Sequence, residues 1–435
     1  MKRKFRIIVG MLLIAIPLCM NAQVKPNKSE PGSKNPKKTE IKKTSKDDPK
    51  KTTNVKPSQE AKPNQQGVKP NHEKPGIDKL AKNEKNEKND KNERPLGGAD
   101  ALKITGFVQG MYQADLNNDF ELQDNTFRMR RVRLSIDGRL LKTVSYKIQG
   151  DFVRSPMLVD AYVKYKPCNE FAIQIGQFKT PFSLESPINP VNLEIFDYGE
   201  NVQKLVGYSD VCGIKAIGRD IGIMATGSLF PIKADGEKGI KYNVVDYAIG
   251  VFNGNGVNVV DNNNRKDVVG RLEVHPGMKD LTLSGSYYYG KYKTSDDDHG
   301  VRNRWSAGAQ YNGGNIVVRG EYFDGTTGYY NDIVNELGDP NEQYRFSNGY
   351  YALAGYTFNI GKDKKQKLMP VLRYEHFAPG DKNGEVFGET NYITAGINYW
   401  PLNTLNFKLD YSLVQHTLGE KTNSHRVVGI LSYKF

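Results

Sequence analysis

Over the last three quarters of the chain, polar and apolar side chains alternate in short runs, and this period of two constrains the fold more than any other feature. In one run, Val132 and Leu134 fall on one face, whereas Arg131 and Arg133 fall on the other. Successive side chains of a β-strand point to opposite faces, so this pattern predicts strands whose two faces contact different surroundings. The predicted strands cover residues 102–114, 127–140, 143–153, 158–167, 170–178, 219–229, 245–253, 266–275, 281–291, 301–312, 315–324, 349–359, 368–377, 391–401, 404–415 and 425–435.

The number and length of these runs predict an all-β fold, a 16-stranded antiparallel transmembrane β-barrel formed by residues 99–435. A tilted strand crosses a bilayer in about 9–11 residues, and most of the runs have this length. Several connections after even-numbered runs are short, such as 141–142 and 276–277, whereas 254–265 and 325–348 are long. Short turns at one rim and long loops at the other are typical of outer-membrane barrels and not of soluble sandwiches.

Residues 1–22 predict a secretory signal peptide, and residues 23–98 predict a disordered periplasmic segment rich in Lys, Pro and Asn. A basic start, an apolar run and the small residue Ala22 are the features of a cleavable signal. The alternative is that Cys19 carries a lipid, but Leu18 stands where a small residue is needed. The following segment holds too few large apolar side chains to offset the entropy of ordering it.

The formal charge of +13 comes entirely from the N-terminal part of the chain. Of 62 Lys and Arg, 4 lie in 1–22 and 20 in 23–95; of 49 Asp and Glu, 11 lie in 23–95, which leaves 38 of each from residue 96 onward. The barrel is therefore neutral overall, and no nucleic-acid groove is expected. We interpret residues 23–95 as a spacer; the alternative is electrostatic contact with the cell wall or acidic head groups.

Between residues 179 and 218 the alternation stops, and two prolines stand close together at Pro187 and Pro190. An irregular insert of this length in a compact domain indicates a functional loop. We predict that it folds into the bore and limits the width and charge of a channel. Its acids are Glu185, Glu194, Asp197, Glu200 and Asp210, against the bases Lys179, Lys204 and Lys215. This excess of carboxylates at a narrow point is expected to repel anions.

The charged face of each strand is predicted to line the lumen, because a charge facing lipid at the bilayer midplane costs about 2–4 kcal/mol. Acids and bases recur on this face at Arg271 and Glu273, Arg319 and Glu321, Arg373 and Glu375, Lys408 and Asp410, and, at wider spacing, Lys147 and Asp151. Two interpretations stay open: these charges neutralise one another across strands, or some bases remain free to attract anions. Arg131, Arg133 and Arg139 are the best candidates for free bases, since only Asp137 lies among them.

Several separated motifs resemble the phosphate-selective porin family of Gram-negative outer membranes. They are FRMRRVRLSIDGRLLKTVSYKIQGDF at 127–152, IQIGQFKTPFSLE at 173–185, DYAIGVFNGNG at 246–256 and DVVGRLEVHP at 267–276. The resemblance implies a trimeric porin whose third extracellular loop folds inward and whose wall bases pass anions along the bore. Arg131, Arg133 and Arg139 would match wall arginines, and Lys179 the base that precedes the inward loop.

The sequence thus predicts an outer-membrane porin for passive diffusion of small solutes, leaning toward anions such as phosphate, with outer-membrane lipid as its surroundings. The alternatives are a non-selective porin and a surface-interaction barrel that acts through long loops such as 325–348. No enzyme activity, cofactor or metal is expected. Asp296 to His299 is interpreted as a solvated charge run, and a hydrolase site at His416 with Ser424 or His425 lacks an orienting group.

Overall fold

The computed structural model describes residues 102–212, 214, 216–233, 239–293, 299–328, 345–379, 388–417 and 421–435. The predictions for residues 1–22 and 23–98, for Lys215 and for the acidic run that begins at Asp296 fall outside these ranges or on side chains that are not described.

In the described residues the strands are β1 (Leu102–Leu116), β2 (Leu122–Arg139), β3 (Val144–Asp151), β4 (Leu158–Tyr165), β5 (Ala172–Lys179), β6 (Arg219–Lys233), β7 (Ile240–Phe252), β8 (Asp267–Val274), β9 (Leu281–Lys293), β10 (His299–Gly313), β11 (Ile316–Gly328), β12 (Arg345–Tyr356), β13 (Phe358–Ile360), β14 (Gln366–Pro379), β15 (Thr390–Leu402), β16 (Leu405–His416) and β17 (Thr422–Lys434). Every predicted run overlaps one of these strands.

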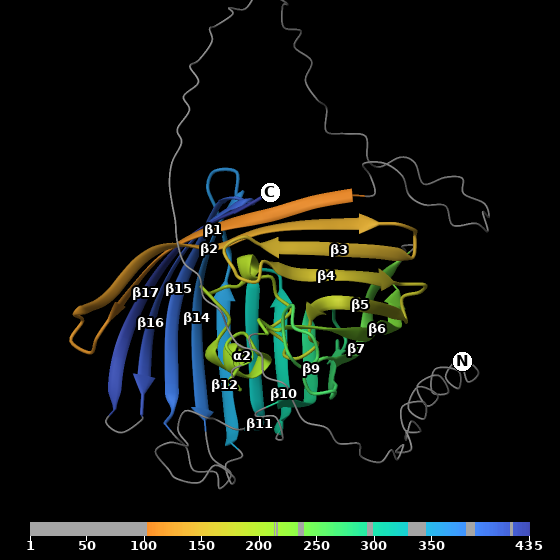
Figure 1. Ribbon diagram of the computed structural model, residues 1–435. Coiled ribbons are helices and arrows are strands. Elements are labelled where there is room, and N and C mark those ends of the chain that lie inside the picture. Colours follow the sequence, from red (N-terminus) through yellow and green to blue (C-terminus); the bar gives the residue numbers. More distant parts are fainter. Residues whose placement is uncertain are drawn as a thin grey trace, which may run out of the picture. The chain divides into compact units, whose positions relative to one another are not determined.

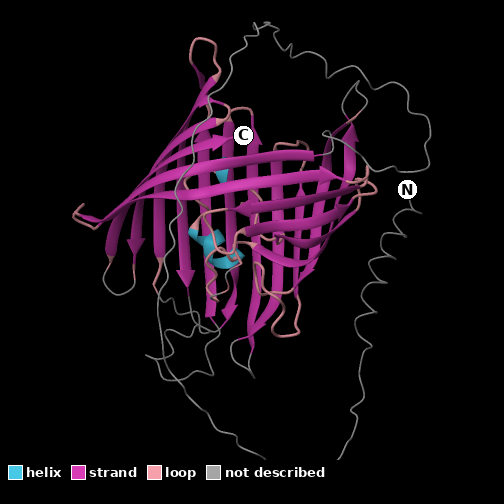
Figure 2. Ribbon diagram, turned by 45° about the horizontal axis from the view of Figure 1, so that its top comes forward, coloured by secondary structure: helices cyan, strands magenta, loops and turns pink. Residues whose placement is uncertain are grey.

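Neighbouring strands pair antiparallel all the way round, and the ring closes where Phe107 of β1 lies opposite Lys434 of β17. Figures 1 and 2 show the strands surrounding a single interior. Because β12 and β13 both pair with β14, they are two parts of one barrel strand, and the barrel has 16 strands. Closure leaves no unpaired sheet edge in the bilayer, where unsatisfied backbone groups are costly. The predicted fold class is confirmed.

The prediction of one continuous strand over residues 349–359 needs a correction at Thr357. The pairing of this strand with β11 ends at Tyr356, which lies opposite Ile316, the first residue of β11. The Thr357 amide donates to the carbonyl of Asn315, in the turn that precedes β11. The chain then resumes as β13, which pairs only with β14.

A β-bulge in β2 shifts the alternation of that strand by one residue. Gln109 of β1 lies opposite Arg131, but the next residue, Gly110, lies opposite Met129, so Arg130 is the extra residue. A bulge changes where the neighbouring side chains point. As a result both Arg130 and Arg131 reach the same carboxylate inside the barrel, as described below.

The connections divide between two rims. One rim, called here the short-turn rim, carries turns such as 140–143, 275–280, 314–315 and 403–404, and the other, the long-loop rim, carries longer connections such as 253–266 and 180–218. The connection 180–218 contains η3 (Pro190–Asn192) and α2 (Glu200–Val206). In the described part of the chain, no helix has the length and apolarity needed to cross a bilayer.

Candidate channel and its charged lining

Residues 180–218, the interior segment, leave β5 at the long-loop rim and lie among the side chains of the opposite wall. Figure 1 shows α2 within the ring of strands. The helix begins after Gly199 and ends at Gly207, whose φ of 101° lies in the left-handed region. At Gly199 a Cβ atom would stand 1.8 Å from Arg373 Nη2. A larger residue at this position would push the head groups of Arg373 and Glu375 aside, so glycine suits this approach of the segment to the wall.

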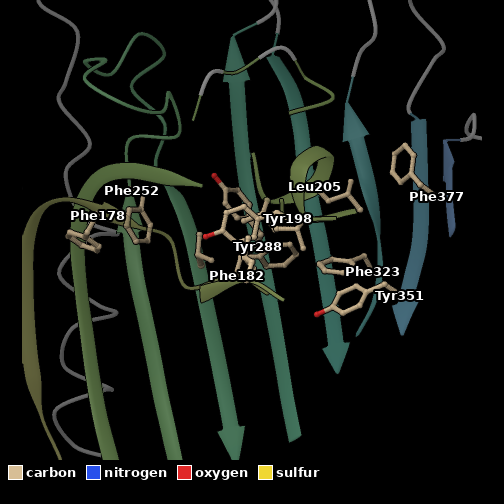
Figure 3. Close-up of a cluster of buried hydrophobic side chains, with 13 residues drawn as sticks. Phe178, Phe182, Tyr198, Leu205, Phe252, Tyr288, Phe323, Tyr351 and Phe377 are labelled. Atoms are coloured by element: carbon tan, nitrogen blue, oxygen red, sulfur yellow. The ribbon is translucent and has the colours of Figure 1, made fainter. Parts of the chain in front are cut away.

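Apolar side chains fasten the interior segment to the wall from β7 to β14. Figure 3 shows this cluster, in which Phe182 makes edge-on contacts with Tyr288 at 5.9 Å and Phe323 at 6.3 Å between ring centroids. Val202 and Leu205 of α2 are completely buried in the same cluster. This side of the bore is filled with packed side chains.

Two carboxylates of the interior segment pair with wall arginines. Glu185 lies 2.6 Å from Arg373 and 3.5 Å from Arg319, and none of its side chain is exposed. Glu194 lies 2.6 Å from Arg319. Arg319 therefore pairs with acids of the segment, and the interpretation that wall charges neutralise one another across strands does not describe it.

Two further carboxylates of the segment, Asp197 and Asp210, also pair with wall arginines. Asp197 lies 2.6 Å from Arg130 and 3.2 Å from Arg131, the two arginines at the bulge. Asp210 receives two hydrogen bonds from Arg304, at 2.8 and 3.0 Å. Asp197 thus ties the segment to β2 on one side, and Asp210 ties it to β10 on the other.

Backbone groups of the segment are satisfied by wall charges as well. Glu321 accepts hydrogen bonds from the Leu184 amide and the Ser183 hydroxyl. Glu375 accepts one from the Asn201 amide near the start of α2, at 2.8 Å. Lys408 donates to the carbonyls of the segment at Leu193 and Ile195. Fixed charges on the wall therefore serve as hydrogen-bond partners for the segment, in addition to the bonds it makes within itself.

The ion pairs also shift the acidity of the segment. Burial alone would raise the pKa of Asp197, but Arg130 and Arg131 outweigh it and hold that pKa below its ordinary value of 3.8. Burial opposes Arg304 at Asp210 and Arg319 at Glu194 in the same way, and the pKa of each carboxyl is lowered. These carboxylates stay ionised at neutral pH and already have cationic partners. The expected repulsion of anions by the segment does not follow from this arrangement.

The arginines predicted to be free on β2 are mostly paired. Arg131 shares Asp197, and Arg133 lies 3.0 Å from Asp151 with both side chains buried. Arg139 is exposed at the end of β2, and no ion pair to it is found among the described residues. The prediction that all three arginines lack partners is therefore wrong for two of them, because their acids come from another strand and from the interior segment.

The remaining bases that were predicted to line the lumen form three kinds of ion pair: with a neighbouring strand, within one strand, and within α2. Lys147 of β3 pairs across strands with Asp137 of β2 at 3.3 Å. Arg271 and Arg373 do reach the acid of their own strand, Glu273 at 3.1 Å and Glu375 at 3.3 Å. On α2, Lys204 lies 3.6 Å from Glu200, one helical turn away.

Lys179 is the last residue of β5, and its hydrogen-bond partners are uncharged groups. Its Nζ donates to the carbonyl of Ile188 at 3.1 Å and to the Tyr198 hydroxyl at 3.0 Å. Within the described ranges no carboxylate forms an ion pair with it. Lys179 therefore supports the first turn of the segment through hydrogen bonds to uncharged groups.

A cavity of about 320 Å³ lies beside the interior segment, against the wall from β2 to β6. Four bases line it, namely Arg133, Lys147, Lys179 and Arg219, with Asp160 as the single lining carboxylate. Asp160 is already bonded to Arg219 at 2.7 Å. The segment thus fills the bore toward β7–β14 and leaves open space beside the basic part of the wall.

The alternation of the sequence contained signals for some of the arginines that we did not single out. Arg130 is revealed by the doubled arginine, which changes the phase of the alternation within β2. Arg302 and Arg304 alternate with Ser306 on one face of β10, and all three are buried. Arg219 follows the irregular segment directly, and only its distant partner Asp160, 59 residues away, shows its role.

A closed antiparallel barrel with an apolar outer face, a charged interior and a segment packed into the bore defines an outer-membrane channel of the porin class. Residues 102–435 match the family model described as phosphate-selective porin O and P, and the chain belongs to this family. Family and fold place the protein in the outer membrane of a Gram-negative bacterium and point to a channel, not an enzyme. A comparison with curated protein sequences found no match.

Solved outer-membrane channels have the same fold at low sequence identity. The channel DcaP of Acinetobacter baumannii is 13% identical, with a TM-score of 0.55, over 78% of this chain and 99% of that one. An anion-selective porin from Comamonas acidovorans is 12% identical, with a TM-score of 0.53, over 77% and 99%. The trimer form of OmpT of Vibrio cholerae is 12% identical, with a TM-score of 0.51, over 77% and 100%.

Proposed function

We propose that this porin conducts small solutes by passive diffusion with a preference for anions such as phosphate. The observation that carries the proposal is the cavity between the interior segment and β2–β6, which four bases and one carboxylate line. Three of these bases are in ion pairs, and Lys179 has no carboxylate partner among the described residues. Membership of the phosphate-selective porin O and P family and the likeness to an anion-selective porin support it.

The proposed mechanism is electrostatic. An anion entering a narrow bore loses part of its hydration, and fixed bases on the wall offset this loss. The interior segment limits solute size, and its carboxylates Glu185, Glu194 and Asp210, bonded to arginines of the opposite wall, do not face the path as free charges. Lys147 is the base best placed to act on a passing ion, since a quarter of its side chain is exposed.

Reversal potentials in a planar lipid bilayer test this proposal. With purified protein in a KCl gradient, we expect discrete channels and a reversal potential of the sign that anion preference gives. Replacing KCl with potassium phosphate compares the two anions. Lys147→Glu is expected to shift the preference toward cations, whereas Lys365→Glu, the same change on an exposed turn, is expected to leave it unchanged.

The other outcomes identify the alternative functions. Channels without ion preference in the unaltered protein would indicate a non-selective porin. Absence of current would favour a surface-interaction barrel; the loop named for it, 325–348, lies mostly outside the described residues.

We further propose that the protein is a homotrimer, as the trimer form of the OmpT neighbour suggests. An apolar groove of about 800 Å³ crosses the strands on either side of the β1–β17 closure, with Gly110 and Gly429 in its lining. Phe127, 82% exposed, and Met129, 50% exposed, lie beside it. A second copy placing side chains into this groove is the contact we propose.

The mass of the detergent-solubilised protein, measured by light scattering, tests the assembly. The unaltered protein is expected to have three times the chain mass. Phe127→Arg, which places a charge in the proposed contact, is expected to give monomers, whereas Phe230→Arg, at an exposed position on β6, is not. Trimers of Phe127→Arg would contradict the groove as the contact.

A further inference from the structure

Three side chains of types that bind transition metals meet on the lumen face near the short-turn rim. Asp246, Glu273 and His275 each offer one ligand atom, and these atoms all lie within 4.8 Å of one another. Asp246 of β7 lies opposite Glu273 of β8, and His275 follows the last residue of β8. All three side chains are partly exposed. A cation in the lumen can therefore reach them without unfolding the rim.

The surroundings of His275 determine which of its nitrogens is available. Its Nδ1 lies 3.2 Å from the carbonyl oxygen of Leu281, which only accepts hydrogen bonds, and 3.2 Å from the Thr282 hydroxyl, which can donate or accept. A hydrogen on Nδ1 serves both contacts. In the neutral ring the lone pair is then on Nε2, which faces Asp246 Oδ2 at 3.0 Å. In this tautomer Nε2 and Oδ2 both accept, and a metal ion between them would satisfy both. In the other tautomer Nε2 donates to Asp246 and Nδ1 accepts from the Thr282 hydroxyl.

Each of the three residues also contacts a neighbouring group that fixes its orientation, as the ligands of a bound metal usually do. A metal-binding histidine generally donates its other N–H to a carbonyl or carboxylate, as His275 does to Leu281. The Ser228 hydroxyl donates to Asp246 Oδ1 at 2.5 Å, which leaves Oδ2 for a metal. Arg271 Nε lies 3.1 Å from Glu273 Oε1 and leaves the second oxygen of Glu273 without an ion-pair partner among the described residues.

We propose that Asp246, Glu273 and His275 bind Zn²⁺ or a similar borderline divalent ion. An imidazole with two carboxylates favours such ions over Mg²⁺ and Ca²⁺, which prefer oxygen ligands alone. Three protein ligands leave one tetrahedral position for water. A neighbouring cavity of about 210 Å³, lined by Asp246, Glu273, Lys164 and Lys166 among others, has room for that water. The nearby bases oppose a cation, and the two carboxylates offset them.

Titration of the metal-stripped, detergent-solubilised full chain with Zn²⁺ by isothermal calorimetry tests the site. We expect one tight site per chain that persists in excess Mg²⁺ and Ca²⁺. Asp246→Asn and His275→Gln are expected to weaken it more than tenfold, and Ser228→Ala, which removes only an orienting group, about tenfold. His416→Gln at the opposite rim and His299→Gln are matched controls expected to bind Zn²⁺ as the unaltered chain does.

Co²⁺ gives a second readout that does not depend on the folding of any variant. Visible absorption of Co²⁺ bound to the unaltered chain is expected to have the intensity of a four-coordinate site, and Zn²⁺ is expected to abolish it by displacement. Equal Zn²⁺ affinity in His275→Gln and the unaltered chain, or Co²⁺ absorption no stronger than that of the free ion, would overturn the proposal. In that case a hydrogen bond from His275 Nε2 to Asp246 accounts for their contact. Channel conductance is not part of this test, so its outcome is independent of the proposed transport.

Discussion

The buried ion pairs of the interior segment position it more than they stabilise the protein. Desolvating two charges costs about as much as their attraction returns, so such a pair is often no better than an apolar contact. Removing one partner is different, because it leaves a charge buried without compensation. Glu185, between Arg319 and Arg373, and Asp197, between Arg130 and Arg131, are the sharpest examples.

Arg373→Met is expected to destabilise the barrel by about 3–5 kcal/mol, since Glu185 and Glu375 lose their shared partner. Adding Glu185→Gln to this variant is expected to restore part of the loss. Urea unfolding in lipid vesicles, followed by the fluorescence of the two tryptophans, measures both. Lys365→Met is the control, because its ion pair with Asp363 is exposed and is expected to contribute nothing measurable. An Arg373→Met variant as stable as this control would contradict the expected cost of leaving Glu185 and Glu375 without Arg373.

Asp197→Asn is expected to strengthen anion preference. The substitution keeps the size of the side chain but removes the charge that Arg130 and Arg131 share, and it adds one positive charge to the lumen. Reversal potentials in a KCl gradient measure the change, and Asp363→Asn on an exposed turn is the matched control. A shift toward cations would show that the segment reorganises when this anchor is lost.

At the scale of elements, the sequence predicted the strands but not the contacts of the segment between β5 and β6. Strand positions follow from a local property, the alternation that lipid and water impose, and each predicted run overlaps a strand. The partners of the segment follow from closure of the ring, which brings Glu194 to Arg319 across 125 residues and Glu185 to Arg373 across 188. No local pattern carries this information, so the acids of the segment that pair with Arg319 could not be identified from the sequence.

The interior segment is expected to stay in place down to about pH 4 and to loosen only under stronger acid. The folded-state pKa of Asp197 lies below its ordinary value of 3.8, so its contribution is complete above that pH and is lost as the pH falls through the lowered value. The lowered pKa values of Glu194 and Asp210 act in the same direction.

Single-channel recordings at stepwise lower pH measure this behaviour. Steady conductance from pH 7 to about pH 4, followed by larger fluctuations in stronger acid, is the expected result. Large fluctuations that begin between pH 7 and pH 5 would show that these carboxylates do not hold the segment.

At the scale of the whole molecule, the barrel is neutral, but its charges lie in two different places: in ion pairs around the interior segment and along the open cavity. From residue 96 onward acids and bases are equal in number, which the sequence shows directly. The interior segment packs against the wall from β7 to β14, where Glu185, Glu194 and Asp210 pair with wall arginines, and the open cavity lies against bases of β2 to β6. Asp197 alone among these acids reaches β2. Selectivity in such a barrel depends on which charges still face water, and that depends on the position of the segment.

The bases that face water attract a passing anion across salt solution, which screens their charge. Anion preference is therefore expected to weaken as the salt concentration is raised. The screening length is about 10 Å at 0.1 M salt and about 3 Å at 1 M, so charges lining a cavity act on a passing ion over much shorter distances in concentrated salt. Reversal potentials measured at one fixed concentration ratio, from dilute to concentrated KCl, follow this loss. Lys147→Glu should differ most from the unaltered protein in dilute salt and least in concentrated salt. A preference independent of salt would mean that anions are selected by direct contact at a dehydrated site, and the long-range role of the bases would then be wrong.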